Sequence, residues 1–82
     1  MKYILDATCM QERKAAHEYL KKVLNLPDYY GGNLDALYDC VYDMDKPEIE
    51  IINMTEADKD EDSYIQKIIF VLDAAHAVIK TS

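Results

Sequence analysis

Acidic and aromatic side chains lie close together in the middle of the chain. Asp35 and Asp39 are four residues apart, so a helix would place them on one face. Tyr38, Tyr42 and Asp43 flank that pair. Like charges at this spacing cost a helix roughly 0.2 to 0.5 kcal/mol, so folding alone does not favour the pair. Carboxylates can hold a basic group through charge-assisted hydrogen bonds, and tyrosines supply rigid contact area. These residue types therefore predict a face that binds a basic partner.

Two further tyrosines precede this segment. Tyr29 and Tyr30 stand directly before Gly31 and Gly32, the only glycines of the chain. Two adjacent glycines predict a turn, and they are too few for a glycine-rich phosphate loop. We expect Tyr30 to pack in the core, and Tyr29 and Tyr38 to lie at the surface.

Two short patterns resemble metal sites but are incomplete. His17-Glu18 begins like a zinc-protease motif, yet Lys21 stands where the second histidine is required. Asp58, Asp60 and Asp62 are spaced like the start of a calcium loop, but the glycine and the glutamate that such a loop needs further along are missing. We expect no metal or cofactor, and we interpret the stretch 55–62 as a solvated acidic loop with room for one helical turn.

The two cysteines give no sign of a disulfide or a zinc framework. Cys9 and Cys40 are far apart and lack any paired spacing, so we expect two buried thiols. Cys40 could form a thiol-imidazole pair with His17 or His76, but nothing in the sequence places them together. We interpret His76 as a cation near the end of a helix, where it would satisfy carbonyl groups.

Charge is distributed unevenly along the chain. The net charge is -7, and residues 28–62 hold 12 acids against two lysines, whereas the remainder holds seven bases against four acids. Such an acidic middle repels nucleic acid and anionic membranes and favours encounter with a basic partner. Acids also keep small domains soluble, so charge alone does not establish a binding role.

Length and composition indicate one folded domain. The 82 residues are 50% hydrophobic and 30% charged, which suits a single modest core and leaves too little chain for a cleft between two lobes. No apolar run approaches the roughly 20 residues that span a bilayer, and Asp6 falls where a signal peptide would still be apolar. We expect one soluble domain over residues 1–82, located in the cytoplasm.

The hydrophobic pattern of the first half predicts a strand and two helices. Lys2–Asp6 is rich in strand formers. Thr8 and Gln11 have the spacing of a capping box, which predicts that the first helix starts there and continues until Pro27 ends it. Asn33 is a favoured N-cap for the second helix. The expected core stripes are Ala16, Leu20, Val23 and Leu24 for the first helix, and Leu34, Leu37 and Val41 for the second.

The second half predicts a strand and a long helix. Glu48–Ile52 follows Pro47 and alternates as a half-buried strand does. Ser63 and Gln66 cap the third helix. Its expected core face is Ile65, Ile68, Ile69, Leu72 and Ala75. Residues 77–81 fit a short third strand, although a helix running on to Ile79 fits the periodicity almost as well.

These elements predict an α/β fold with a small parallel sheet. Strands joined through helices pair in parallel, and parallel sheets are normally covered on both faces. Two strands alone would be marginal, which favours the third. The expected order is β-α-α-β-α with a short C-terminal strand, and the sheet has two to three strands packed with helices.

The segment from Leu26 to Cys40, LPDYYGGNLDALYDC, resembles the signature of the barstar family, which are small cytoplasmic inhibitors of secreted bacterial ribonucleases of the barnase type. The match is dense over these 15 residues and weaker elsewhere, and the order of elements also agrees. The resemblance implies a three-stranded parallel sheet. It also implies that the second helix and the loop before it plug the active site of the nuclease.

Carried over position by position, the resemblance implicates a set of partner-binding residues in which Asp39 is the central acid. Family members also use an acid on the long helix; Asp73 is the nearest candidate, but a shift of one residue in the alignment puts Ala74 there. With the two flanking residues of the second helix, the predicted site comprises Tyr29, Asn33, Leu34, Asp35, Tyr38, Asp39, Tyr42, Asp43 and Asp73.

Two departures from the family pattern matter. Tyr38 stands where the best-known member has tryptophan, which preserves an aromatic anchor. The early end of the sequence leaves open whether the last strand forms and whether an exposed sheet edge pairs with a second copy as a homodimer.

Together, residues and resemblance predict a protein inhibitor rather than an enzyme. Carboxylates of Asp35 and Asp39 would take phosphate positions in the basic active site of a secreted, barnase-type ribonuclease, with no direct binding of nucleic acid or membrane. An acidic adaptor with the same fold and a partner other than a nuclease is the main alternative. A small hydrolase that uses Cys40, or the acidic loop with a metal, is a third.

Overall fold

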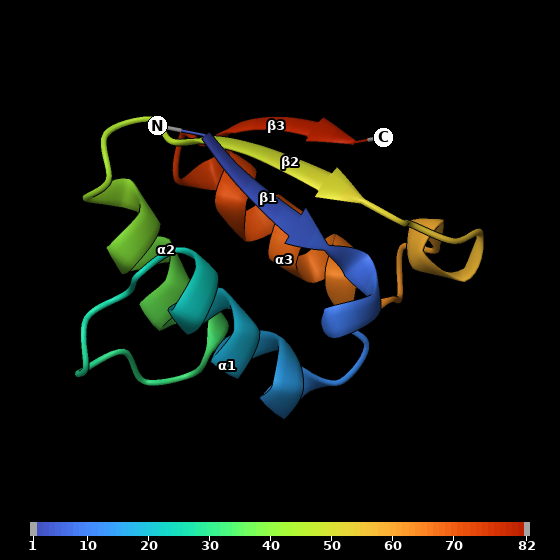
Figure 1. Cartoon of the computed structure of the whole chain (residues 1–82), viewed down its shortest axis with the longest axis horizontal. Coiled ribbons are helices and arrows are strands. Elements are labelled where there is room, and N and C mark those ends of the chain that lie inside the picture. The colour runs from blue at the N-terminus through green and yellow to red at the C-terminus, as the bar shows by residue number, and fades with distance from the viewer. Residues whose placement is uncertain (1, 82) are drawn as a thin grey trace.

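The computed structural model describes residues 2–81 and shows a three-stranded sheet packed against three α-helices (Figure 1). The strands are β1 (Lys2–Asp6), β2 (Glu48–Ile52) and β3 (Val78–Thr81), and the helices are α1 (Arg13–Val23), α2 (Leu34–Tyr42) and α3 (Tyr64–Ala74). Two short 3-10 helices, η1 (Ala7–Cys9) and η2 (Ala57–Lys59), follow the first two strands. The predicted α/β fold and element order are confirmed, and the third strand is present.

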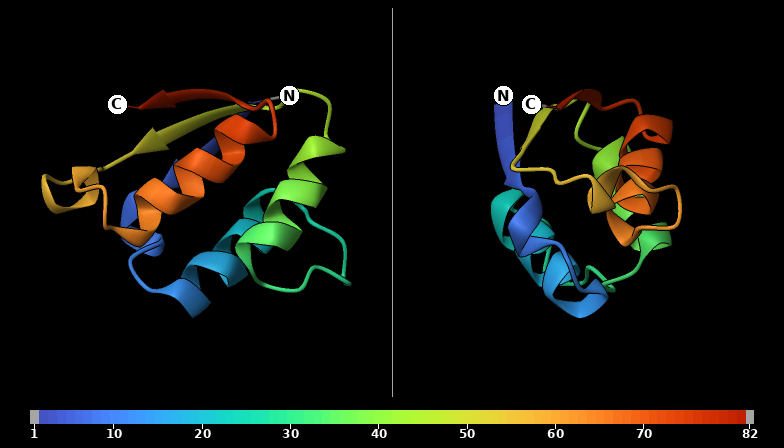
Figure 2. Two further views of the ribbon diagram at one scale, coloured as in Figure 1. Left: turned by 180° about the vertical axis from the view of Figure 1, so that it is seen from behind. Right: turned by 90° about the vertical axis from the view of Figure 1, so that its right-hand side faces the viewer.

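The sheet is parallel throughout, with the strand order β1-β2-β3. Tyr3 pairs with Ile49, and Ile49 pairs with Ile79. Both crossovers therefore step in the same direction across the sheet. Because crossovers between parallel strands are almost always right-handed, two steps in one direction place their helices on the same face. Figure 2 shows all three α-helices on that one side of the sheet.

The core lies between the inner face of the sheet and the helices. Leu5, Ile49 and Ile51 point inward from the strands and are fully or almost fully buried. The helices contribute the predicted stripes, of which Ala16, Leu20, Leu37, Val41, Ile65, Ile68 and Leu72 are buried. At the edges of the stripes, Val23, Leu34 and Ile69 are only partly buried. Hydrophobic periodicity thus locates the core faces correctly.

The outer face of the sheet has no helix over it within residues 2–81, so the expectation that both faces would be covered is wrong. Ile4 and Val78 are 52% and 57% exposed on this face. Charged residues alternate with them, and Lys2 Nζ lies 3.0 Å from Glu50 Oε1. This face is uncovered because both crossovers step in the same direction across the sheet. The charged residues on it make it compatible with water.

The predicted capping box at Thr8 does not form. Asp6, at the end of β1, accepts hydrogen bonds from the Thr8 amide at 2.9 Å and from the Thr8 hydroxyl at 2.7 Å, which caps η1 instead. Gln11 donates through Nε2 to the carbonyl of Ala7 at 2.8 Å. The α1 helix begins only at Arg13. The Asp6 carboxylate thus occupies the Thr8 amide, to which the Gln11 side chain would bond in a capping box.

Two residues with positive φ end α1 and α3. Asn25 has φ 53°, and the Leu26 amide donates to the carbonyl of Lys21, so α1 ends before Pro27. His76 has φ 69°, and the Ala77 amide donates to the carbonyl of Leu72 at 3.0 Å. Bonds of this type across a left-handed residue close a helix. This closure releases the chain into β3 and excludes a helix that runs on to residue 79.

Candidate functional site

The loop before α2 fixes where that helix begins. The Tyr30 amide donates to the carbonyl of Pro27 at 3.0 Å, and Gly32 has φ 68°, a conformation that residues with a side chain rarely adopt. Asn33 then caps α2, because its Oδ1 accepts from the Ala36 amide at 2.8 Å. The predicted N-cap is confirmed. The cap occupies the amide oxygen of Asn33, so its Nδ2 is the group left to donate to a partner.

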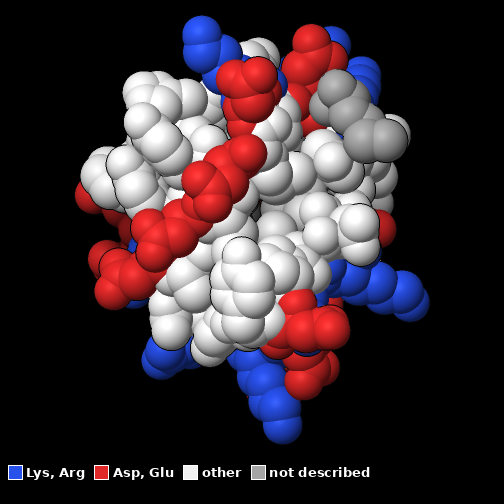
Figure 3. Space-filling model, turned by 90° about the vertical axis from the view of Figure 1, so that its left-hand side faces the viewer, with Lys and Arg blue, Asp and Glu red and all other residues white. Residues whose placement is uncertain are grey.

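The acids of α2 form an exposed row. Asp35, Asp39 and Asp43 follow one another at intervals of four residues, and all three are exposed while Leu37 and Val41 face the core. Figure 3 shows a diagonal run of acidic side chains with uncharged side chains on both sides of it, seen from the side where α2 lies in Figure 1. Lysine and arginine side chains lie toward the margin of this view.

No base within residues 2–81 forms an ion pair with this row. Among residues 2–81, the ion pairs are Lys2 with Glu50 and Lys59 with Glu56, and neither involves α2. Aligned carboxylates without a basic partner repel one another, so the arrangement costs α2 some stability. A row of this kind is suited to an external cation.

Aromatic rings line one side of the acids. Tyr38 and Tyr42 stack with ring centroids 5.9 Å apart, and the His76 ring lies 5.7 Å from that of Tyr42. Together with Asp39 and Asp43, the two tyrosines surround a shallow hollow of about 400 Å³. The His76 ring therefore packs beside the site, and it is the backbone amide of this residue that satisfies a helix carbonyl, that of Asp73.

The tyrosines of the preceding loop separate as expected. Tyr29 is 83% exposed and Tyr38 is 38% exposed, whereas Tyr30 is buried. The phenol oxygen of Tyr30 contacts His17 Nδ1, and His17 Nε2 lies 2.5 Å from the Tyr64 hydroxyl. Burial of His17 and the nearby charge of Arg13 lower the pKa of its imidazole, and burial raises the pKa of Tyr30 and of Tyr64.

This buried polar chain is not predicted by the sequence pattern. His17 connects α1, the loop before α2 and the first turn of α3, and thereby holds the loop that carries Tyr29. The available signal is its position on α1, three residues before Leu20 and hence on the apolar face. In the sequence, His17 followed by Glu18 instead resembles the start of a metal motif, which is incomplete.

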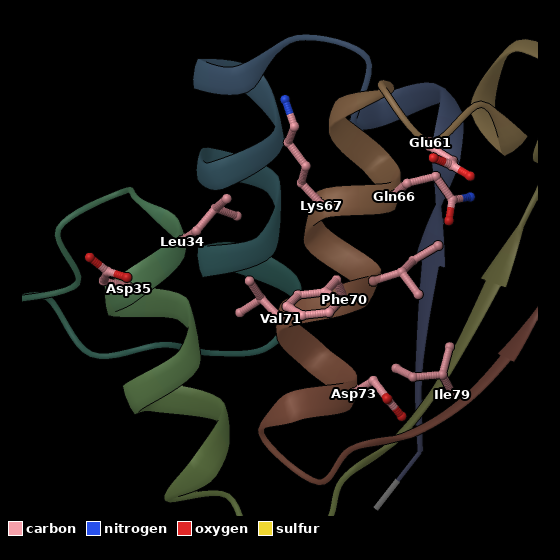
Figure 4. A pocket seen from close by; sticks show the side chains of 10 residues that line it. Leu34, Asp35, Glu61, Gln66, Lys67, Phe70, Val71, Asp73 and Ile79 are labelled. Atoms are coloured by element: carbon pink, nitrogen blue, oxygen red, sulfur yellow. The ribbon is translucent and has the colours of Figure 1, made fainter.

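A groove runs across the outer side of α3, from α2 on one side to β3 on the other (Figure 4). Leu34 and Asp35 line it from α2, and Phe70, Val71 and Asp73 line it from α3 (Figure 4). Asp73, the predicted acid of the long helix, lines the same groove as Asp35, but Figure 4 shows it on the side of α3 toward Ile79, so the two acids lie at opposite ends of the groove.

The cysteine thiols and the metal-binding side chains are the groups with potential for catalysis. Burial, together with the charges of Asp39 and Asp43, raises the pKa of the Cys40 thiol, which is the opposite of the shift that activates a nucleophile. Cys40 is half-buried, but Cys9 is exposed at the end of η1, so the expectation of two buried thiols is wrong for Cys9. No group of three metal-binding side chains lies together within the described part of the chain.

The acidic loop is less solvated than expected. Asp58 is 2% exposed, because its carboxylate accepts from the Thr55 amide at 3.0 Å and from Gln11 Nε2 at 3.1 Å. These hydrogen bonds lower the pKa of the Asp58 carboxyl. Asp58 thus links η2 to Gln11 in the segment before α1. The acids that follow it, Asp60, Glu61 and Asp62, are exposed. The predicted helical turn is the 3-10 helix η2.

Comparison with known proteins places this geometry in a family. The family model described as Barstar (barnase inhibitor) matches residues 1–81. The chain belongs to the barstar family. Both the predicted resemblance and the three-stranded parallel sheet that it implied are confirmed.

One relative of known name supports the barstar assignment over part of the chain. A Bacillus subtilis (strain 168) protein named "Putative ribonuclease inhibitor YrdF" is 48% identical over 40 residues. The matched segment covers 49% of this chain and 44% of that protein, so the similarity spans less than half of the relative. No helix within residues 2–81 is long and apolar enough to cross a membrane.

Proposed function

We propose that this barstar-family chain inhibits a basic, secreted ribonuclease of the barnase type by inserting the α2 face into its active site. The observation that carries the proposal is the exposed row of Asp35, Asp39 and Asp43, which has no basic partner among the described residues. A ribonuclease site holds phosphate with basic side chains, so aligned carboxylates can take the phosphate positions. The family description and the name of the relative agree with such a role.

The α2 helix is built to present its acids rigidly. Asn33 fixes its first turn, and Leu37 and Val41 anchor it in the core. A preorganised face loses little conformational freedom on binding, which favours affinity. Tyr38 and Tyr42 stand beside the acids, where they exclude water and strengthen the charge-assisted hydrogen bonds that form.

The loop residues extend this face. Tyr29 is the most exposed of the large hydrophobic side chains on the loop and helix, and it offers a flat ring for contact with the nuclease. Asn33 donates through Nδ2, and Leu34 contributes apolar area at the edge of the groove. Inhibition is steric, since the chain covers the site and no bond is made or broken. The cytoplasmic location and the extent of the domain over 1–82 remain predictions.

The first test compares two substitutions that remove the same charge. In an inhibition titration against purified barnase, we expect Asp39→Ala to raise the inhibition constant by at least roughly a hundredfold, because it removes the central acid of a desolvated contact. Asp62→Ala is the matched control, since Asp62 is exposed and belongs to the acidic stretch before α3 rather than to α2. It should change the constant by no more than about threefold. Asp58 is unsuitable as a control because it is buried and supports the fold.

Equal effects of the two substitutions would contradict the assigned face. If the unaltered chain leaves barnase fully active at micromolar concentration, the barnase-type target is wrong. The acidic adaptor with a different basic partner would then be the better description of this fold.

A further inference from the structure

The outward side of α3 is unusually apolar. Phe70 is 75% exposed, and Ile69 and Val71 on either side of it are only half-buried. The α1 helix instead directs Arg13 and Lys14 outward, as a helix at a protein surface normally does. An exposed phenylalanine with apolar neighbours is the kind of patch that marks an interaction surface.

This patch lies in the middle of the groove that runs across α3 from α2 to β3 (Figure 4). The groove has a volume of about 730 Å³, and Leu34, Val71 and Ile79 also line it. Figure 4 shows Leu34 and Val71 between the two helices, with Phe70 on the face of α3 that is turned to the viewer. An apolar side chain that enters this open groove would contact apolar side chains from α2, α3 and β3.

The charges around the groove select the kind of partner. Asp35, Glu61 and Asp73 line it, against one base, Lys67. A second copy of this chain would bring the same excess of acids to the contact and be repelled. A basic partner is attracted, and this is the same preference that the α2 row imposes.

The groove is continuous with the α2 face. Leu34 and Asp35 belong both to the groove and to the first turn of α2. A protein seated on the acids of α2 therefore reaches Phe70 without a second, separate contact site. The apolar wall then adds buried area at the side of a contact that is otherwise polar and charged.

We propose that Phe70 is a specificity-determining contact, and that the groove receives an apolar side chain of the same basic nuclease, next to the mouth of its active site. This proposal rests on the function proposed above. The acids of α2 would bind any nuclease with a basic site, whereas the groove over α3 distinguishes those that carry an apolar residue at the right place. Specificity then comes from shape on α3, and attraction comes from charge on α2.

The experiment uses the full chain and purified barnase as the probe. We expect Phe70→Ala to weaken inhibition roughly tenfold or more, because removing an apolar ring from a desolvated interface acts mainly by speeding dissociation. Phe70→Leu should retain most of the affinity, since it keeps apolar volume in the groove. Ile4→Ala is the control, because Ile4 is 52% exposed on the outer face of the sheet. It should change inhibition by less than about twofold.

The kinetics separate this proposal from the one on which it depends. Phe70→Ala should leave the salt dependence of the association rate unchanged, whereas Asp39→Ala should reduce it. If Asp39→Ala weakens inhibition and Phe70→Ala does not, the groove is not part of the contact and only the present proposal is overturned. If Asp39→Ala has no effect on an inhibitory chain, the α2 face itself is misassigned. A dimer of the unaltered chain that Phe70→Ala converts to a monomer, with inhibition unchanged, would assign the groove to a second copy instead.

Discussion

His17 has a structural role outside the predicted site. Its two ring nitrogens contact the hydroxyl groups of Tyr30 and Tyr64, which come from the loop before α2 and from the start of α3. A neutral imidazole can donate from one nitrogen and accept at the other, so it satisfies both tyrosines. A protonated ring would place a charge and a second donor in a residue that is only 3% exposed to solvent. The folded state therefore favours the neutral form.

This preference predicts how stability depends on pH. Because burial lowers the pKa of His17 below its ordinary value of 6.5, the unfolded chain binds the proton first as the pH falls. The stability contributed by neutral His17 is present above that value and is lost as the pH falls from about 6.5 toward the lower folded-state pKa, by at most about 1.4 kcal/mol per pH unit. Urea unfolding between about pH 8 and about pH 5 measures it.

His17→Gln provides the control for the pH prediction. Glutamine can still hydrogen-bond to both tyrosines but does not titrate, so the variant should show a flatter dependence over the same interval. An unchanged slope would assign the dependence to other groups. Asp58 acts in a separate, more acidic window, because its pKa is lowered from 3.8 and its contribution is lost only below that value.

At the scale of elements, periodicity predicts what faces the core, and local competition decides where helices begin. The predicted stripes of α1, α2 and α3 are correct because burial repeats with the turn of the helix. The predicted start of α1 is wrong, because the Thr8 amide donates to the Asp6 carboxylate instead of taking part in a capping box. The His17–Tyr30 contact could not be predicted either. Its partners are 13 residues apart and meet only when α1 and the following loop fold back on each other.

The site is more predictable than the fold details around it. The predicted acids and tyrosines of α2 lie on the surface because Asn33 is the cap and Leu37 and Val41 form the buried stripe, which leaves their neighbours outside. Phe70 is absent from the predicted site, because the apolar run of α3 gives no sign of which member remains exposed. That depends on how far α2 covers α3, which is a property of packing.

The cap of α2 gives a prediction at this scale. Asn33→Ala removes the oxygen that accepts from the Ala36 amide, so it should lower the free energy of unfolding by about 1 kcal/mol. Asn33→Asp keeps an accepting oxygen but loses the Nδ2 donor. It should therefore retain stability while weakening inhibition. Thermal unfolding and inhibition titrations of both variants measure the two roles, and equal loss of stability in both would contradict the capping role.

At the scale of the whole molecule, charge segregation predicts fast, salt-sensitive association. The acids concentrate in residues 28–62, and the row on α2 lies on the face proposed to meet the nuclease. Raising the salt concentration from about 50 mM to about 500 mM should slow association with barnase by at least roughly tenfold and change dissociation much less. Stopped-flow fluorescence measures both rates. A salt effect confined to dissociation would contradict electrostatic steering by the acidic face.

The exposed thiol of Cys9 has a practical consequence. Cys9 is exposed and lies in η1, which follows β1 and is apart from α2 in Figure 1 and in the left view of Figure 2. Cys40, whose pKa is raised, reacts more slowly with alkylating reagents near neutral pH. A maleimide dye can therefore be attached selectively at Cys9. The labelled protein would report complex formation by anisotropy without an obstacle on the recognition surface.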